Sequence, residues 1–76
     1  MQEREARLLK ESGDLDKVVI GRSGDNRGWS MQLVAKNGDA QMLNSKRSKD
    51  PRVFKTSDAA LRCCLRIGVN SAVVAI

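Results

Sequence analysis

The sequence predicts a single α+β domain in which a curled antiparallel sheet of about four to five short strands packs on one helix, with a further helix at the N-terminus. Three observations favour this class. Apolar and polar residues alternate on both sides of an Asn-Gly pair, a capped segment near the C-terminus has apolar residues at helical spacing, and the 76 residues suit one small domain. The hairpin and the helix each have an apolar face, so we expect these faces to pack together.

Residues 1–13 are expected to form a helix that precedes a basic body, residues 17–76. Glu3 and Arg7 make an i,i+4 pair in the favourable order, and Gly13 suits the end of a helix. An isolated helix this short is marginal in water, so it must dock on the body or fray.

The stretch WSMQLVAKNGDAQMLNSK, after a first strand in LDKVVIGR, predicts a β-hairpin. Asn37-Gly38 favours a two-residue type I′ turn with positive φ, which places Lys36 opposite Asp39 and Leu33 opposite Met42. In this register the apolar face of the hairpin carries Trp29, Met31, Leu33, Ala40 and Met42.

The last third of the chain predicts a turn, a strand, a helix and a strand. Pro51 follows a turn, and RVFK returns as a short strand with Val53 or Phe54 inward. Thr56 or Ser57 can cap the helix SDAALRCCLRIG, which ends at Gly68. Its core-facing stripe is Ala60, Cys63, Cys64 and Ile67. SAVVAI is expected to be a buried final strand.

Positive charge is concentrated in the body of the protein. The whole chain carries +5, whereas residues 1–16 hold five acidic against three basic side chains. A basic body favours a polyanionic partner, although a solvated charged surface would give the same composition. The candidate nucleic-acid contacts lie in two predicted loops and strand ends: Lys46, Arg47, Lys49, Arg52, Lys55, Arg22 and Arg27.

An enzyme is not expected, and no catalytic, cofactor or metal-ligating residue is predicted. The chain has no His, and its two thiols, Cys63 and Cys64, fall on the buried stripe of a helix. They are expected to be reduced core residues of a cytoplasmic protein. No stretch is long and apolar enough to span a membrane.

The C-terminal stretch PRVFKTSDAALRCCLRIGVNSAVVAI, preceded by GWSMQLVAKNGD, resembles small plasmid-encoded partition-associated or stability proteins of the ParC type. The resemblance covers residues 28–76. The RxFKTxDAA pattern is also similar to the arm-DNA-binding domains of phage integrases. The resemblance implies a protein of a bacterial mobile element, with an accessory role in plasmid maintenance and no catalytic residues.

Two functions follow as expectations. In the first, the protein is a non-enzymatic accessory factor that contacts double-stranded DNA through its basic loops. In the second, it is a protein-interaction module with no direct nucleic-acid contact, either a homodimer or a regulator that binds a partner such as a partition protein or another plasmid-encoded protein. An edge strand or the N-terminal helix would hold that partner.

Overall fold

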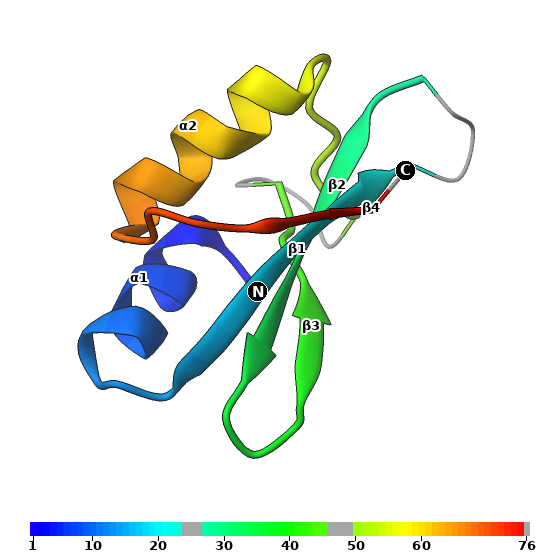
Figure 1. The fold of residues 1–76 in the computed structure, drawn as a ribbon. Coiled ribbons are helices and arrows are strands. Elements are labelled where there is room, and N and C mark those ends of the chain that lie inside the picture. The colour runs from blue at the N-terminus through cyan, green and yellow to red at the C-terminus, as the bar shows by residue number, and fades with distance from the viewer. Residues whose placement is uncertain (24–26, 46–49, 76) are drawn as a thin grey trace.

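The computed structural model describes residues 1–23, 27–45 and 50–75, which form two helices and one open four-stranded sheet (Figure 1). Along the chain the elements are α1 (Glu3–Glu11), β1 (Leu15–Arg22), β2 (Trp29–Ala35), β3 (Ala40–Met42), α2 (Ser57–Ile67) and β4 (Val73–Ala75). The strand order is β3-β2-β1-β4. The α+β class and the N-terminal helix are therefore confirmed. No helix of the described residues has the length and apolar character needed to cross a membrane.

Helix α1 docks on the body instead of fraying. Its Ala6 is fully buried, and Leu9 packs against the same core. The backbone N–H of Asn44 donates to the carbonyl oxygen of Met1 at 2.7 Å, which ties the segment before the helix to the residues after β3. Gly13, with φ of 83°, ends the helix as expected.

The β2–β3 hairpin has a register one residue away from the predicted one. Asp39 pairs with Ala35, whose N–H donates to its carbonyl oxygen at 2.8 Å, and not with Lys36. The loop therefore has three residues. The N–H of Gly38 donates to the carbonyl oxygen of Ala35, and Gly38 takes the positive φ of 96° that follows a type I turn in such loops.

This shift exchanges the two faces of β3, because neighbouring residues of a strand point to opposite sides. Met42 lies opposite Gln32 on the open face, and was wrongly expected in the core. Leu43 takes the buried position instead, with its N–H donating to the carbonyl oxygen of Met31 at 2.8 Å. The glycine was correctly placed, but the turn type was wrong.

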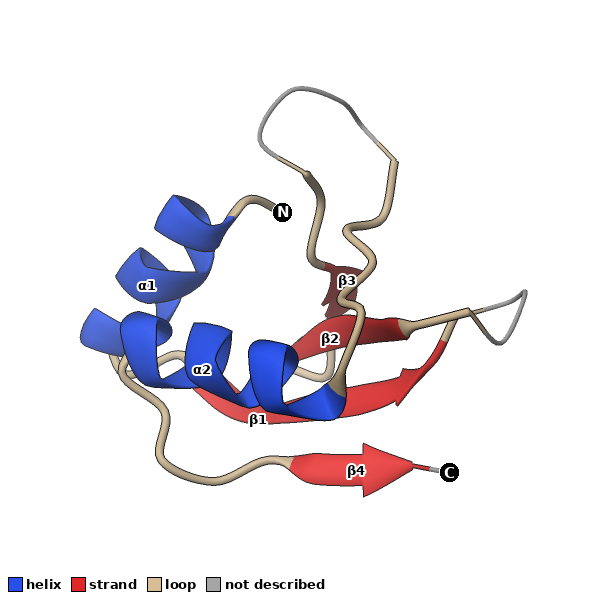
Figure 2. Ribbon diagram, turned by 90° about the horizontal axis from the view of Figure 1, so that it is seen from above, coloured by secondary structure: helices blue, strands red, loops and turns tan. Residues whose placement is uncertain are grey.

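Helix α2 forms as its sequence predicts. The side-chain oxygen of Thr56 accepts from the N–H of Ala59 at 3.1 Å, and Gly68 ends the helix with φ of 104°. The predicted stripe is buried: Ala60, Cys63, Cys64 and Ile67. Both helices pack against one face of the sheet, and the core lies between them and that face (Figure 2).

The last strand differs from the prediction in direction and in burial. β4 pairs with β1 in parallel, so the sheet is mixed and not wholly antiparallel. The reason is that α2 carries the chain back across the sheet, which lets β4 start in the same direction as β1. All three residues of β4 are exposed because the strand lies at the sheet edge.

The expected return strand in RVFK does not form in the described part of the chain. Phe54 makes one isolated bridge, to Trp29, and Pro51, just before this stretch, makes another, to Asn44. Phe54 is buried, whereas Val53 is exposed.

Candidate nucleic-acid interface

The structure places four of the seven predicted contact residues. Lys46, Arg47 and Lys49 lie outside the described residues. Arg22, Arg27 and Lys55 are exposed, and Arg52 is partly buried. Arg22 ends β1, and Arg27 belongs to the loop before β2. Arg52 and Lys55 belong to the segment that leads into α2.

A short β-bridge joins the region of Arg22 and Arg27 to the segment that carries Arg52 and Lys55. Trp29 and Phe54 exchange both backbone hydrogen bonds at 2.8 Å, which fixes the start of β2 beside the segment before α2. Each ring also lies under a guanidinium, Arg22 over Trp29 and Arg52 over Phe54, with 4.7 Å from the guanidinium carbon to the ring centre in both pairs. The end of β1 and the start of α2 therefore lie at the same end of the molecule (Figure 1).

Three arginines line a groove of about 440 Å³ at this end, which we call the arginine groove. One wall is a face of α2 and the other is the segment before the helix. The lining residues are Arg52, Phe54, Thr56, Asp58, Ala59, Arg62 and Arg66. The three arginines thus come from two separate segments and line one groove, together with Asp58; guanidinium groups on one groove are suited to binding oxyanions.

Two of these arginines are held in place by Glu3 of α1. Its Oε1 atom accepts from Nη2 of Arg66 at 2.9 Å and from Nε of Arg66 at 3.2 Å. Nη1 of Arg52 lies 3.6 Å from the same oxygen, and Arg7 approaches the other oxygen at 4.0 Å. Since only 16% of the Glu3 side chain is exposed, this network links α1, α2 and the segment before α2.

The network also sets the ionisation of its members. The hydrogen bonds from Arg66 hold the pKa of Glu3 below its ordinary value, against the opposing effect of partial burial. The same contact raises the pKa of Arg66. Glu3 is therefore a carboxylate at neutral pH and offsets part of the positive charge around the groove.

The thiols are buried core groups, as the sequence predicts. Burial, with a hydrogen bond of 3.2 Å from Sγ to Oε1 of Glu3, raises the pKa of Cys63 to about 12. Burial also raises the pKa of Cys64. Both side chains are therefore protonated at neutral pH and are poor nucleophiles.

Arg62 is the most available cation of the groove. It is exposed, and within the described ranges no ion pair holds its guanidinium. The sequence placed Arg62 and Arg66 on the outer side of the helix, away from the sheet, and outside the candidate site. Their i,i+4 spacing predicts that Arg62 and Arg66 share one face of the helix beside the buried stripe. Nothing in the sequence predicts that Arg52 lies across the groove from them.

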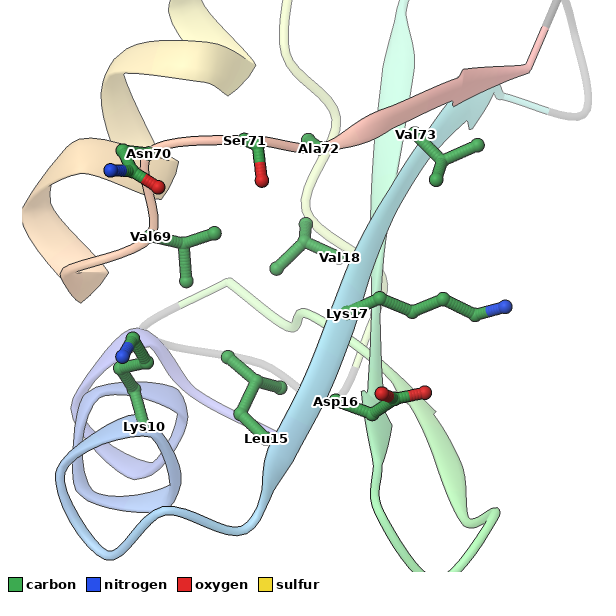
Figure 3. Close-up of a pocket in the computed structure, with 10 residues that line it drawn as sticks. All are labelled: Lys10, Leu15, Asp16, Lys17, Val18, Val69, Asn70, Ser71, Ala72 and Val73. Carbon is green, nitrogen blue, oxygen red and sulfur yellow. The ribbon is translucent and has the colours of Figure 1, made fainter.

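A second cavity, of about 330 Å³, lies between the end of α1, the first half of β1 and the segment before β4 (Figure 3). Leu15, Val18 and Val69 point into it. Asp16 and Lys17 point to the other side of β1, so their charges do not converge on the cavity (Figure 3). Its lining is less suited to an anion than the arginine groove.

No protein-family model, curated protein or solved structure matches this chain.

Proposed function

We propose that the protein binds double-stranded DNA by contacts to the phosphate backbone, without catalysis. The observation that carries this proposal is the convergence of Arg52, Arg62 and Arg66 on one groove. In the sequence, the basic stretch of residues 46–55 precedes α2, contains Arg52 and includes Lys46, Arg47 and Lys49. Cations on a helix face and on a neighbouring loop suit phosphate oxygens, which position a protein without reading base sequence.

The state of the two aromatic residues favours duplex over single-stranded nucleic acid. Single-strand binding proteins stack bases on open aromatic rings. Here Phe54 is buried, and Arg22 and Arg52 each cover one of the two rings. With base stacking disfavoured, the protein can still contact the phosphates on the outside of a duplex through the guanidinium groups of its arginines and the ammonium groups of its lysines.

The biological role in this proposal comes from the resemblance to ParC-type proteins. It is an accessory role in the maintenance of a plasmid or other mobile element, in the cytoplasm, with a partition protein or another plasmid-encoded protein as a further partner. The two free, buried cysteines fit a reducing compartment.

A salt-dependent anisotropy titration with a random-sequence duplex tests the proposal. Each phosphate contact contributes about 0.9 to the slope of log affinity against log salt, between about 50 and 200 mM. Arg62→Gln should lower that slope by about 0.9 and weaken binding to every duplex alike. Replacing Lys46, Arg47 and Lys49 together by Gln should lower the slope by up to about 3.

Lys36→Gln is the matched control. It removes one exposed positive charge from the β2–β3 turn, at the end of the molecule opposite the start of α2 (Figure 1). We expect its salt slope to equal that of the unmodified protein. The proposal is wrong if the unmodified protein shows no salt-dependent binding, or if Arg62→Gln and the triple variant bind like Lys36→Gln.

A protein-interaction module is the second candidate function, and the exposed edge strand β4 is the observation that favours it.

A further inference from the structure

The outer edge of β4 is open to a further strand. β4 is the last strand in the sheet order, and its only pairing among the described residues is the parallel one with β1. Along its other side the backbone N–H and C=O groups have no strand partner in the described part of the chain. An edge of this kind is a template for pairing with an extended segment.

The side chains at this edge do not discourage pairing. From Ile67 to Ala75 the chain has no charged residue and no proline, which are two of the features by which natural edge strands avoid association, although β4 itself has only three residues. Val73 is 53% exposed and Val74 is 42% exposed, on opposite faces of the sheet. β-branched residues favour an extended conformation, so the strand is suited to a larger sheet.

A further apolar surface lies on α2, beside the loop that precedes β4. Leu61 and Leu65 are exposed on the flank of α2 opposite the arginine groove. With Cys64 and residues 69–71 they line a shallow depression of about 150 Å³. Residues 69–71 belong to the loop that leads into β4.

We infer that the occupant of this edge is β4 of a second copy of the chain, paired antiparallel about a two-fold axis. Antiparallel pairing of identical strands requires an axis perpendicular to the sheet, which keeps the same face of both copies upward. With the axis midway between Val73 and Val74, the cross-strand pairs are Val73 with Val74 and Ala72 with Ala75. The contact is self-complementary and uncharged.

Charge favours this edge as the meeting point of two copies. Each chain carries a formal +5, so two copies repel one another wherever their basic surfaces meet. At β4 they approach through a stretch without charge, and the arginine groove lies on the other flank of α2.

Symmetric pairing has a consequence for DNA binding, and this consequence rests on the proposed function. The two sheets join into one continuous sheet with all four helices on the same face. Both arginine grooves then lie on that face and can contact one duplex together, which raises affinity through effective concentration.

Sedimentation equilibrium of the full chain, without DNA, tests the dimer itself. We expect a reversible dimer of the 8.4 kDa chain. Val73→Lys should raise the dimer dissociation constant by more than tenfold, because a charged residue blocks edge pairing. Val53→Lys is the matched control, since Val53 is 55% exposed but lies before α2, and it should leave the constant unchanged.

Cross-linking keeps the inference testable if Val73→Lys unfolds. Ala72, Val73, Val74 and Ala75 are replaced by cysteine one at a time and treated with a short bis-maleimide, to which the buried native thiols are slow to react. The residue nearest the axis should give a covalent dimer. A chain that stays monomeric, a dimer that Val73→Lys leaves intact, or the absence of a cross-link in all four variants would overturn the inference. Because no DNA is present, failure here is separate from failure of the DNA-binding proposal.

Discussion

Replacing Glu3 by Gln should destabilise the protein by loosening the contact between α1 and α2. Glutamine has nearly the same shape as glutamate but no charge. Its amide nitrogen cannot accept the hydrogen bonds that a carboxylate oxygen accepts. The variant therefore removes the charge-assisted part of the hydrogen bonds from Arg66 and the attraction to Arg52. It leaves the burial of Ala6 and Leu9 largely unchanged.

The magnitude follows from how each partner is exposed. A hydrogen bond to a charged group contributes about 1.5–3 kcal/mol when it is sheltered, and an exposed ion pair contributes about 0.2–1 kcal/mol. Glu3 is sheltered, but the side chains of Arg66 and Arg52 are 47% and 33% exposed. Solvent screening places the expected loss between these two ranges, at about 1–1.5 kcal/mol.

Urea unfolding near pH 7 and near pH 3 measures this loss and its pH dependence. Because the folded-state pKa of Glu3 is lowered from 4.5, its contribution is present above about pH 4.5 and is lost as the pH falls through the lowered pKa. The difference in stability between the unmodified protein and Glu3→Gln should therefore shrink near pH 3.

Glu11→Gln is the control, since Glu11 is an exposed residue at the end of the same helix, and it should change stability by less than about 0.5 kcal/mol. If Glu3→Gln is as stable as this control near pH 7, or if its deficit is the same at both pH values, the network does not hold the helices together.

Three further predictions concern buried thiols and glycines. Cys63 and Cys64 should react slowly with a thiol reagent in the native state and quickly in denaturant, and Cys64→Ser should cost about 1–3 kcal/mol in a chemical unfolding curve; rapid native reaction of both would contradict their burial. Gly38→Val should lower the melting temperature through a loss of more than about 1 kcal/mol, entirely from its φ of 96°, because an added Cβ meets no atom within 4 Å; an unchanged melting temperature would mean that this residue does not adopt a positive φ. Gly28→Ala should cost about 1–3 kcal/mol because its Cβ would lie 2.5 Å from a backbone oxygen, whereas Gly21→Ala, with its nearest atom at 4.0 Å, should cost less; equal unfolding midpoints would show that the chain relaxes around the new methyl group.

The features of this protein that depend on a few neighbouring residues could be predicted from the sequence. The cap at Thr56, the helix end at Gly68 and the positive φ of Gly38 follow from local backbone chemistry. The burial of Cys63 and Cys64 follows from helical periodicity, which acts within two turns of one helix. The basic stretch of residues 46–55 was likewise visible as a run of charge.

The contacts between distant segments could not be predicted from the sequence, because they arise when the helices pack on the sheet. The register of the hairpin differs by one residue from the predicted one, because an Asn-Gly pair suits more than one type of turn. As a result Leu43, and not Met42, is buried in the core. β4 became a parallel, exposed edge because α2 crosses the sheet before it.

The candidate site depends on the most distant of these contacts. Arg66 is positioned by Glu3, 63 residues away in the chain, and it faces the groove that Arg52 lines from another segment. A composition of arginines and glutamates is compatible with many such pairings, and the free energy of each depends on burial and distance, which arise only when the helices pack.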